Sequence, residues 1–252
     1  MRTAVITGAS AGLGQEFVRQ IQSVFPEIQE YWLMARRADR LASLAETLPG
    51  VTVKVLPLDL TGPDYISELS LALERDKPEV SLLVGCAGCG YLGNFDESPL
   101  EEQLRMLDLN IRALTAVTRL VLPYMPKGGR IIHISSIASF VPNPRMTIYS
   151  ATKSFVSAFS RGLHEELKPR GISVTAVCPG PMDTEFIQLG RIKGNSKTFD
   201  VLPYCDPVQV VHGALTAAKK GKAVYTPKAF YKFYRVLSAL IPHAILVHAA
   251  KT

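Results

Sequence analysis

The stretch Thr3–Gly14, TAVITGASAGLG, decides the fold because it joins a strand, a glycine-rich turn and the start of a helix. An apolar run ends at Thr7, the glycines follow in a G-x-x-x-G-x-G pattern, and helical spacing begins at once. Glycine permits tight turns and lets backbone N–H groups approach a diphosphate closely, and the helix presents its positive N-terminus to that charge. This context predicts a dinucleotide-binding turn formed by Gly8, Ser10, Ala11, Gly12, Leu13 and Gly14.

Outward from this turn, apolar strand-like runs alternate with segments of helical spacing along the chain. The runs are TAVITG, YWLMA, VTVKVLPL, VSLLVG, GRIIHISS, GISVTAVCP and KAVYT. They are apolar on both faces, as is typical of a parallel sheet covered by helices on both sides. No Pro/Gly/Ser-rich linker and no internal repeat divides them. We therefore predict a single α/β Rossmann domain over residues 1–252, a doubly wound parallel sheet of about seven strands.

Composition sets the broad class of the protein. Apolar residues make up 47% of the 252 residues and charged residues 20%, so a sizeable core can form. Four cysteines, no secretory signal and no run of apolar residues long enough to span a bilayer favour a cytoplasmic, reduced protein. No metal site is expected, and His164 is expected on a helix surface.

The net charge of +6 belongs to the end of the chain, because no acidic residue follows Asp206. We favour a C-terminal helix in residues 227–252 that docks on the domain or on a second subunit. A weak contact of this basic, apolar tail with a membrane surface remains an alternative. Nucleic-acid binding is not expected, because no known reading motif accompanies the charge.

The end of the second predicted strand indicates which nicotinamide cofactor is used. An acidic residue near this position would bind the ribose 2′-hydroxyl of NAD, but Arg36 and Arg37 stand here instead. Guanidinium groups suit a 2′-phosphate, so NADP(H) is preferred over NAD(H). After the third strand, Asp59 and Leu60 are expected to contact the adenine end, although Asp59 could equally be a capping residue.

The segment Ile134–Phe155 carries the predicted chemistry. Ser136 ends the fifth strand, and Tyr149 and Lys153 follow at i and i+4, so their side chains share one helix face. An ammonium group and an oxidised nicotinamide ring would lower the pKa of the Tyr149 phenol, so that it exchanges a proton with a substrate oxygen. A serine hydroxyl would fix the position of that oxygen.

With these residues in place, the chain resembles the short-chain dehydrogenase/reductase family over nearly all of residues 2–226. The resemblance rests on TGASAGLG, on the set Ser136, Tyr149 and Lys153, on Asn110 in LDLNIRAL, and on PGPMDT at Pro179–Thr184. It implies that Tyr149 is the acid/base, that Lys153 lowers its pKa and binds the nicotinamide ribose, and that Ser136 orients the carbonyl. It also implies that Asn110 holds a water linked to Lys153. Further cofactor contacts are expected at Cys86, Ala87, Gly88, Pro179, Gly180, Met182 and Thr184.

The substrate is expected beyond the carboxyl ends of the strands. Residues 185–206 are long for a passive connection, and the family resemblance suggests a mobile lid over the substrate. An apolar pocket is expected from Tyr91, Phe140, Met146 and Phe186 around Ser136 and Tyr149. We therefore expect interconversion of a hydrophobic ketone and a secondary alcohol, such as a hydroxysteroid, a 3-oxoacyl chain or an apolar xenobiotic carbonyl.

The sequence leaves two alternative functions open and also implies a homo-oligomer. A nucleotide-binding scaffold or sensor without turnover would be favoured by loss of the tyrosine or lysine, and both are present. Epimerase or dehydratase chemistry could use the same site. The family resemblance implies a homodimer or homotetramer built through the helices that carry Asn110 and Tyr149.

The sequence departs from the family at the end of the fourth strand, where Gly85, Cys86, Ala87 and Gly88 replace an Asn-Asn-Ala-Gly sequence. Whatever the two asparagine amides hold in relatives must be held otherwise here. Cys86 and Cys89 form a C-x-x-C, but they follow a buried strand and lack a second ligand pair. We expect Cys86 to be an apolar filler beside the cofactor and Cys89 to line the path to the substrate.

Overall fold

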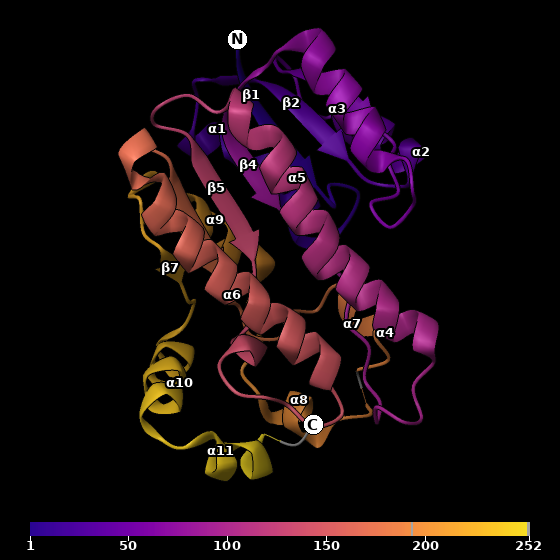
Figure 1. Cartoon of the computed structure of the whole chain (residues 1–252), viewed down its shortest axis with the longest axis vertical. Coiled ribbons are helices and arrows are strands. Elements are labelled where there is room, and N and C mark those ends of the chain that lie inside the picture. The colour runs from indigo at the N-terminus through magenta and orange to yellow at the C-terminus, as the bar shows by residue number, and fades with distance from the viewer. Residues whose placement is uncertain (193, 251–252) are drawn as a thin grey trace.

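The structure is a computed structural model that describes residues 1–192 and 194–250; Lys193 of the predicted lid and Lys251–Thr252 of the tail lie outside the described residues. Its centre is one seven-stranded sheet in the order β3-β2-β1-β4-β5-β6-β7, with every pairing parallel (Figure 1). The strands are β1 (Arg2–Thr7), β2 (Ile28–Met34), β3 (Thr52–Leu56), β4 (Glu79–Gly85), β5 (Arg130–Ile134), β6 (Ser173–Val177) and β7 (Val224–Tyr225). The predicted doubly wound α/β fold is confirmed.

Strand order reverses between β1 and β4, which lie side by side although two strands separate them in the chain. In open parallel sheets a ligand binds beyond the carboxyl ends of the strands at such a switch point. The first turn, after Thr7, and the loop after Gly85 meet at this place. The fold therefore puts the predicted dinucleotide turn and the C-x-x-C segment next to each other.

Helices cover both faces of the sheet. One face carries α1 (Gly12–Val24), α2 (Ala38–Glu46) and α9 (Pro207–Lys219). The other face carries α3 (Tyr65–Asp76), α5 (Leu114–Val121) and α6 (Thr147–Leu167), and α4 (Leu100–Leu107) packs against α6. A π-helical turn, η1 (Asp108–Ala113), joins α4 to α5, and short 3₁₀ turns lie at Leu122–Tyr124 (η2), Ile137–Ser139 (η3) and Lys168–Arg170 (η4).

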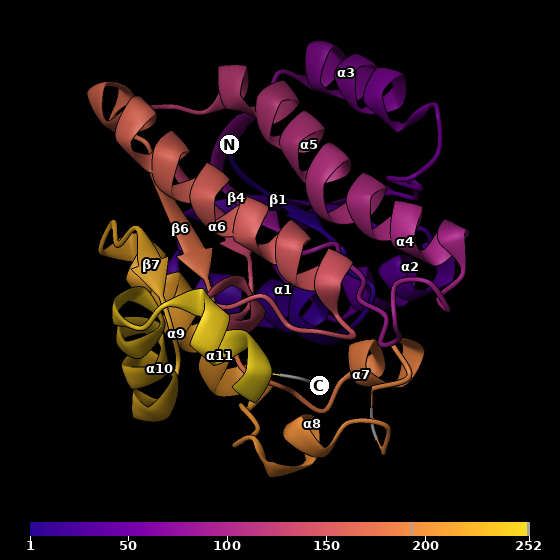
Figure 2. The same cartoon turned by 60° about the horizontal axis from the view of Figure 1, so that its bottom comes forward.

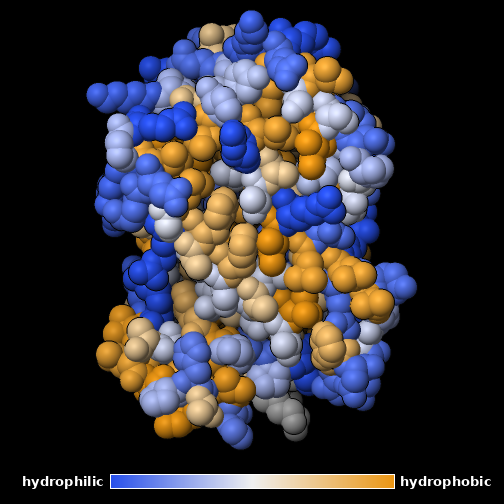
Figure 3. Space-filling model, viewed as in Figure 1, coloured by the Kyte–Doolittle hydropathy of each residue, from blue (hydrophilic) through white to orange (hydrophobic). Residues whose placement is uncertain are grey.

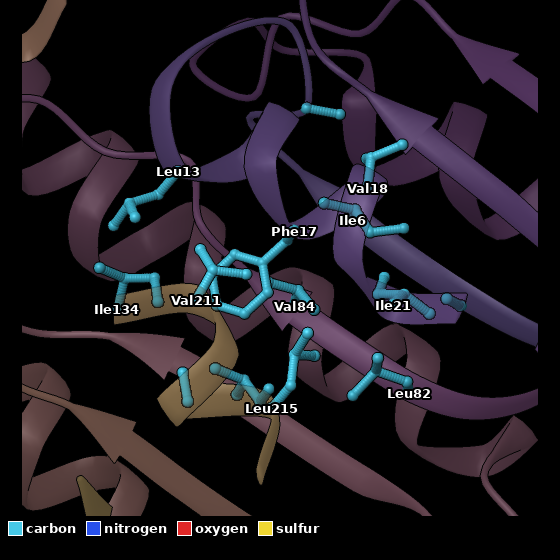
Figure 4. Close-up of a cluster of buried hydrophobic side chains, with 14 of the residues drawn as sticks. Ile6, Leu13, Phe17, Val18, Ile21, Leu82, Val84, Ile134, Val211 and Leu215 are labelled. Carbon is cyan, nitrogen blue, oxygen red and sulfur yellow. The ribbon is translucent and has the colours of Figure 1, made fainter. Parts of the chain in front are cut away.

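The two apolar cores follow from the alternation of side chains along each strand. In β1, Ala4 and Ile6 join the core under α1 and α9, whereas Val5 joins the core under α3 and α5. Figure 4 shows Phe17 of α1 among Ile6, Val84, Val211 and Leu215, which come from β1, β4 and α9. These contacts hold α1 on the sheet and thereby place its N-terminus at the switch point.

The lid and the tail gather at the carboxyl end of the sheet (Figures 1 and 2). The lid contains α7 (Glu185–Leu189) and α8 (Lys197–Val201), and the tail contains α10 (Ala229–Leu240) and α11 (His243–Ala249). Tyr231 of α10 is fully buried, and its hydroxyl donates to the carbonyl of Pro203 at 2.8 Å. The tail is thus docked on the domain, as favoured from the sequence. Among residues 1–192 and 194–250, no helix is long and apolar enough to cross a membrane.

Candidate active site

A cavity of about 620 Å³ runs along the carboxyl ends of the strands, from the glycine turn to the tail. This volume is ordinary for a binding site for a cofactor or a small ligand. Predicted site residues that line it are Gly8, Ser10, Ala11, Gly12, Leu13, Arg36, Arg37, Asp59, Leu60, Cys86, Ala87, Gly88, Tyr91, Ser136, Tyr149, Lys153, Pro179, Gly180, Met182, Thr184 and Phe186. The fold therefore collects one cavity from segments spread over most of the chain.

The glycine turn fits a bound diphosphate. Gly8 and Gly12 have φ angles of 69° and 52°, which L side chains rarely adopt. The N-cap of α1, Ala11, provides no side-chain hydrogen bond, so the first N–H groups of this thirteen-residue helix face the cavity without a side-chain cap. A Cβ at Gly14 would strike the backbone carbonyl of Gly8, so this glycine packs the helix against the strand. Gly14 supports the turn from behind and does not line the cavity.

Basic side chains lie where the adenosine end of a dinucleotide is expected. Arg36 and Arg37 both line the cavity, and Arg37 donates from Nε and Nη2 to the hydroxyl of Ser10, each at 3.3 Å. Asp59 also lines it and accepts from the backbone and hydroxyl of Thr61. Burial opposes ionisation of Asp59, but the bonds from Thr61 hold the pKa of its carboxyl below the usual value. Asp59 therefore caps its own turn while it faces the cavity.

The loop after β4 is held by two polar side chains from elsewhere in the chain. The hydroxyl of Thr7 accepts hydrogen bonds from the backbone N–H groups of Cys86 and Ala87, at 3.0 and 3.1 Å. The amide of Asn110 bonds both backbone groups of Cys89, at 2.9 and 2.8 Å. The Asn-Asn pair of the family is missing here, and these bonds provide partners for the backbone of Cys86, Ala87 and Cys89 without it.

Ser136, Tyr149 and Lys153 come together at the wall of the cavity as predicted. Tyr149 and Lys153 lie one turn apart on α6, with the Lys153 ammonium 5.7 Å from the centre of the Tyr149 ring. The ammonium donates to the carbonyl of Ile134 at 2.9 Å, which anchors it at the end of β5. Ser135 adds a second tie between β5 and α6, because its hydroxyl donates to the Lys153 carbonyl at 2.8 Å.

Burial dominates the protonation of this set. It raises the pKa of Tyr149 to about 12, although a hydrogen bond with Ser136 opposes the rise. It lowers the pKa of Lys153 to about 8, because an ammonium group loses its hydration there. At neutral pH the phenol is therefore protonated and the amine is charged. The lowering of the tyrosine pKa expected from Lys153 together with an oxidised nicotinamide ring stays a prediction for the complex with the cofactor.

Asn110 is 1% exposed and lies in η1, beside the Ser136–Tyr149–Lys153 set. Besides its bonds to Cys89, its amide donates to the hydroxyl of Thr152 at 3.0 Å. Gly88 permits this approach, since a Cβ there would lie 3.0 Å from Asn110 Oδ1 and 3.4 Å from Lys153 Nζ. The side chain thus positions the loop and α6. π-Helical turns are frequent at functional sites, and the sequence carries no periodic signal for this one.

Two predicted substrate residues lie behind the cavity wall. Met146 is 2% exposed and packs with Tyr149 in a small apolar cluster. Phe140 packs against Tyr234 of α10, with ring centres 6.0 Å apart. Tyr234 lines the cavity in its place, because the docked tail covers the η3 loop. Both residues support lining side chains and do not themselves line the cavity.

Sequence reasoning did not single out several lining residues. Glu185 and Phe199 lie within the predicted lid, residues 185–206, whereas the other side chains were not named from the sequence: Arg105, Asn143, Phe230, Tyr231 and Tyr234. The tail aromatics could be recognised as an apolar helix, but nothing in their order showed which surface they cover. The expected surface position of His164 is wrong: it is 7% exposed, and its Nδ1 lies 2.8 Å from the carbonyl oxygen of Val174.

The two cysteines of the C-x-x-C line the cavity as free thiols. Burial raises the pKa of Cys86 to about 12 and that of Cys89 above its ordinary value. Reactive and metal-bound thiols are deprotonated, so neither cysteine has the character of a redox or zinc site. Within the described part of the chain, no three His, Cys, Asp or Glu side chains group as a metal site would require.

Comparison with known proteins agrees with this geometry. The family profile described as short chain dehydrogenase matches residues 2–191. An uncharacterized oxidoreductase of Staphylococcus aureus strain N315 is 31% identical over 185 residues, which cover 73% of this chain and 79% of the relative. A relative in Staphylococcus epidermidis, also an uncharacterized oxidoreductase, is 29% identical over 82% of this chain and 89% of its own length.

Two solved structures share the fold and most of its length. A short-chain dehydrogenase from Sphingobium yanoikuyae in complex with NADPH superposes with a TM-score of 0.82, at 30% identity over 95% of this chain and 94% of that one. A bulky-bulky ketone specific alcohol dehydrogenase from Comamonas testosteroni gives 0.76, at 28% identity over 95% and 92%. With the glycine turn, the Ser136–Tyr149–Lys153 set and the cavity that joins them, these matches identify the chain as an NAD(P)-dependent enzyme of the short-chain dehydrogenase/reductase family.

Proposed function

We propose that the protein is an NADP(H)-dependent reductase of bulky, apolar ketones. The observation that carries this proposal is the position of Tyr149, whose ring lines the cavity beside an apolar wall, while Arg36 and Arg37 line the same cavity near the glycine turn. Apolar and aromatic side chains that line the cavity include Phe186, Ile187, Phe199, Leu202, Phe230 and Tyr231. The Phe186 ring packs against that of Tyr149. The relative from Comamonas that acts on bulky-bulky ketones supports the substrate class by analogy.

The residues of this chain fit the proton transfer that accompanies the reduction of a carbonyl group. When bound, the reduced nicotinamide supplies a hydride to the carbonyl carbon. Tyr149, protonated at neutral pH because burial raises its pKa to about 12, donates its proton to the carbonyl oxygen. Ser136 shares a hydrogen bond with Tyr149 and orients the same oxygen. The Lys153 ammonium then stabilises the phenolate that remains, and the protonated resting state of Tyr149 favours reduction over oxidation.

The test is NADPH oxidation, followed at 340 nm, against steroid, 3-oxoacyl and aromatic ketones of increasing bulk. We expect turnover that rises with the apolar bulk on both sides of the carbonyl. Tyr149→Phe should lower kcat by about 10²-fold or more, the usual contribution of a positioned acid, while NADPH still binds. Tight NADPH binding without turnover of any ketone would instead support a nucleotide-binding scaffold.

We further propose that α4 and α6 pair with a second copy of this chain. Leu100, Leu104 and Leu107 of α4 and Phe155 of α6 are large apolar side chains exposed to solvent. Their grouping fits the assembly through these helices that the family resemblance implies. Light scattering at micromolar concentration should give the mass of a dimer or tetramer, and a monomer would contradict this.

The tail is proposed to make only a weak contact with an anionic lipid surface. Phe233, Val236 and Leu240 are exposed on α10, and Figure 3 shows apolar surface at the lower left, where α10 and α11 lie in Figure 1. Lys228 and Lys232 add positive charge beside them. Cosedimentation with anionic vesicles, but not with neutral ones, would support this contact, and Phe233→Glu should abolish it.

A further inference from the structure

An ion cluster joins the predicted adenosine end of the cavity to the lid. Both terminal nitrogens of Arg37 donate to Glu185 Oε2 at 3.1 Å, and Arg40 Nη1 donates to Glu185 Oε1 at 2.6 Å. Arg37 and Arg40 flank the start of α2, whereas Glu185 is the first residue of α7. Residues 145 or more positions apart in the chain are thus paired across the mouth of the cavity.

Glu185 lies on the two arginines, Arg37 and Arg40, at the end of the cavity where the 2′-phosphate of NADP(H) is expected. Arg37 bonds the Glu185 carboxylate and the Ser10 hydroxyl with the same guanidinium group, and all three residues line the cavity. The Glu185 carboxylate shows that the guanidinium groups of Arg37 and Arg40 bind an anion in this position. A phosphate and a carboxylate cannot share Arg37 without like-charge repulsion, so one must displace the other.

Glu185 is also next in sequence to Phe186, whose ring packs against that of Tyr149. Phe186 follows Glu185 in α7, and its ring centre lies 5.6 Å from that of Tyr149. The packing is tight, because a Cβ at Gly90 would lie 2.7 Å from both Phe186 Cζ and Tyr149 Cδ2. At the other side of α7, a Cβ at Gly12 would be within contact distance of Thr184. With Glu185 paired, α7 is therefore held over both the glycine turn and Tyr149.

We propose that Glu185 is a specificity-determining residue that competes with the 2′-phosphate for Arg37, so that NADP(H), but not NAD(H), releases the start of α7. The proposal rests on the proposed preference for NADP(H) and adds a coupling between the cofactor's phosphate and access to Tyr149. In the free protein, Glu185 neutralises Arg37 and Arg40 and keeps Phe186 against Tyr149. The 2′-phosphate takes over the arginine, and the lid is then free to admit the ketone.

The chain offers a matched control within the lid. Arg191, just after α7, forms an ion pair with Glu102 of α4 that involves neither Arg37 nor Arg40. Glu102→Gln therefore loosens the lid without freeing Arg37. Glu185→Gln keeps the shape of the side chain and removes its charge, so both variants are expected to fold, which circular dichroism checks.

The experiment compares adenosine 2′,5′-bisphosphate with adenosine 5′-monophosphate as probes, by calorimetric titration and by hydrogen exchange of residues 185–189. Glu185→Gln should bind the bisphosphate about twofold to fivefold more tightly, the range expected from a partly exposed ion pair, with the affinity for the monophosphate unchanged. In the unmodified protein, only the bisphosphate should raise exchange in α7. In Glu185→Gln, exchange should be high before any probe is added. Glu102→Gln should leave both affinities unchanged.

The outcomes distinguish a failure of the proposed role of Glu185 from a failure of the proposed preference for NADP(H). If the unmodified protein binds the two probes equally, the preference for NADP(H) fails. If it prefers the bisphosphate, but Glu185→Gln changes neither that preference nor the exchange of α7, the role of Glu185 is overturned and the cofactor preference stands. Equal tightening of both probes in Glu185→Gln would likewise overturn it, since competition for Arg37 requires the 2′-phosphate.

Discussion

The side-chain amide of Asn110 bonds the backbone of Cys89 twice, accepting from its N–H at 2.9 Å and donating to its carbonyl at 2.8 Å. Asn110 lies in η1 on one side of the cavity, and Cys89 lies in the loop after β4. A further bond to Thr152 extends the connection to α6. One buried amide thus holds together three segments that lie around Ser136, Tyr149 and Lys153.

Asn110→Ala should destabilise the protein by about 2–4 kcal/mol, because it leaves both backbone groups of Cys89 without their partner. Urea unfolding measures the loss. Asn110→Asp is the informative comparison, because its carboxylate accepts from the Cys89 N–H but repels the Cys89 carbonyl. If Asn110→Ala unfolds at the same urea concentration as the unmodified protein, the loop is held by other contacts.

Thr7→Val should weaken cofactor binding and cost about 1–3 kcal/mol of stability, because the N–H groups of Cys86 and Ala87 lose their common acceptor. Thr7→Ser keeps the hydroxyl and should retain most of both properties. The measurements are urea unfolding and titration with NADPH. Equal behaviour of the valine and serine variants would show that the hydroxyl does not replace the missing asparagines.

Lys153 should make the stability of the cofactor-free protein rise with pH above 8. Burial lowers its folded pKa to about 8 from an ordinary value of 10.5, so the unfolded chain binds more protons between these values. Below pH 8 the desolvation of the buried ammonium lowers the free energy of unfolding by its full amount. As the pH approaches 10.5, the free energy of unfolding recovers by up to about 3 kcal/mol. Tyr149, with its pKa raised to about 12, acts in the opposite direction only above pH 10.

Urea unfolding at pH 7.5 and 9.5, for the unmodified protein and Lys153→Met, isolates this contribution. The stability of the unmodified protein should increase relative to that of the variant over this interval. Parallel pH profiles for the two proteins would mean that Lys153 is solvated and keeps an ordinary pKa.

Two glycine-to-alanine changes should act in opposite directions. Gly14→Ala should destabilise the protein by more than about 2 kcal/mol and abolish cofactor binding, because its Cβ would strike the backbone of Gly8. Gly162→Ala lies in the exposed interior of α6 with open space around its Cβ, and should stabilise by about 0.5–1 kcal/mol. Thermal unfolding of both variants checks the signs, and a neutral Gly14→Ala would contradict the packing of α1 on β1.

Cys86 should react with iodoacetamide at pH 8 more slowly than a small-molecule thiol, by about a hundredfold or more, because burial raises its pKa to about 12 and leaves little thiolate. Cys89 should also react more slowly than a small-molecule thiol, because burial raises its pKa. Saturating NADPH should slow the reaction further, since both line the cavity. Mass spectrometry of the alkylated peptides follows each site. Rapid stoichiometric alkylation would restore the case for a redox C-x-x-C.

The features that could be predicted are those written in consecutive residues. Strand and helix periods, the glycine turn at Gly8–Gly14 and the i, i+4 pair Tyr149–Lys153 are local, so their geometry follows from the backbone that the sequence itself favours. The parallel, doubly wound class of sheet followed from the alternation of strands and helices, because parallel strands require crossover connections, whereas the strand order came from the structure. Hence the fold class was predicted correctly. Ser136, Tyr149 and Lys153 line the cavity, and their catalytic roles stay a prediction.

Contacts between distant residues were settled by packing. The pairing of Glu185 with Arg37, the support of Cys89 by Asn110 and the docking of Tyr231 on the lid join segments whose order in the chain carries no sign of their meeting. The pKa of Tyr149 in the cofactor-free protein belongs to the same group, because burial by the folded chain raises it. The amino-acid order determines which groups are present and which helix face they share; solvent exclusion and long-range contacts, which exist only once the chain has folded, determine what those groups do.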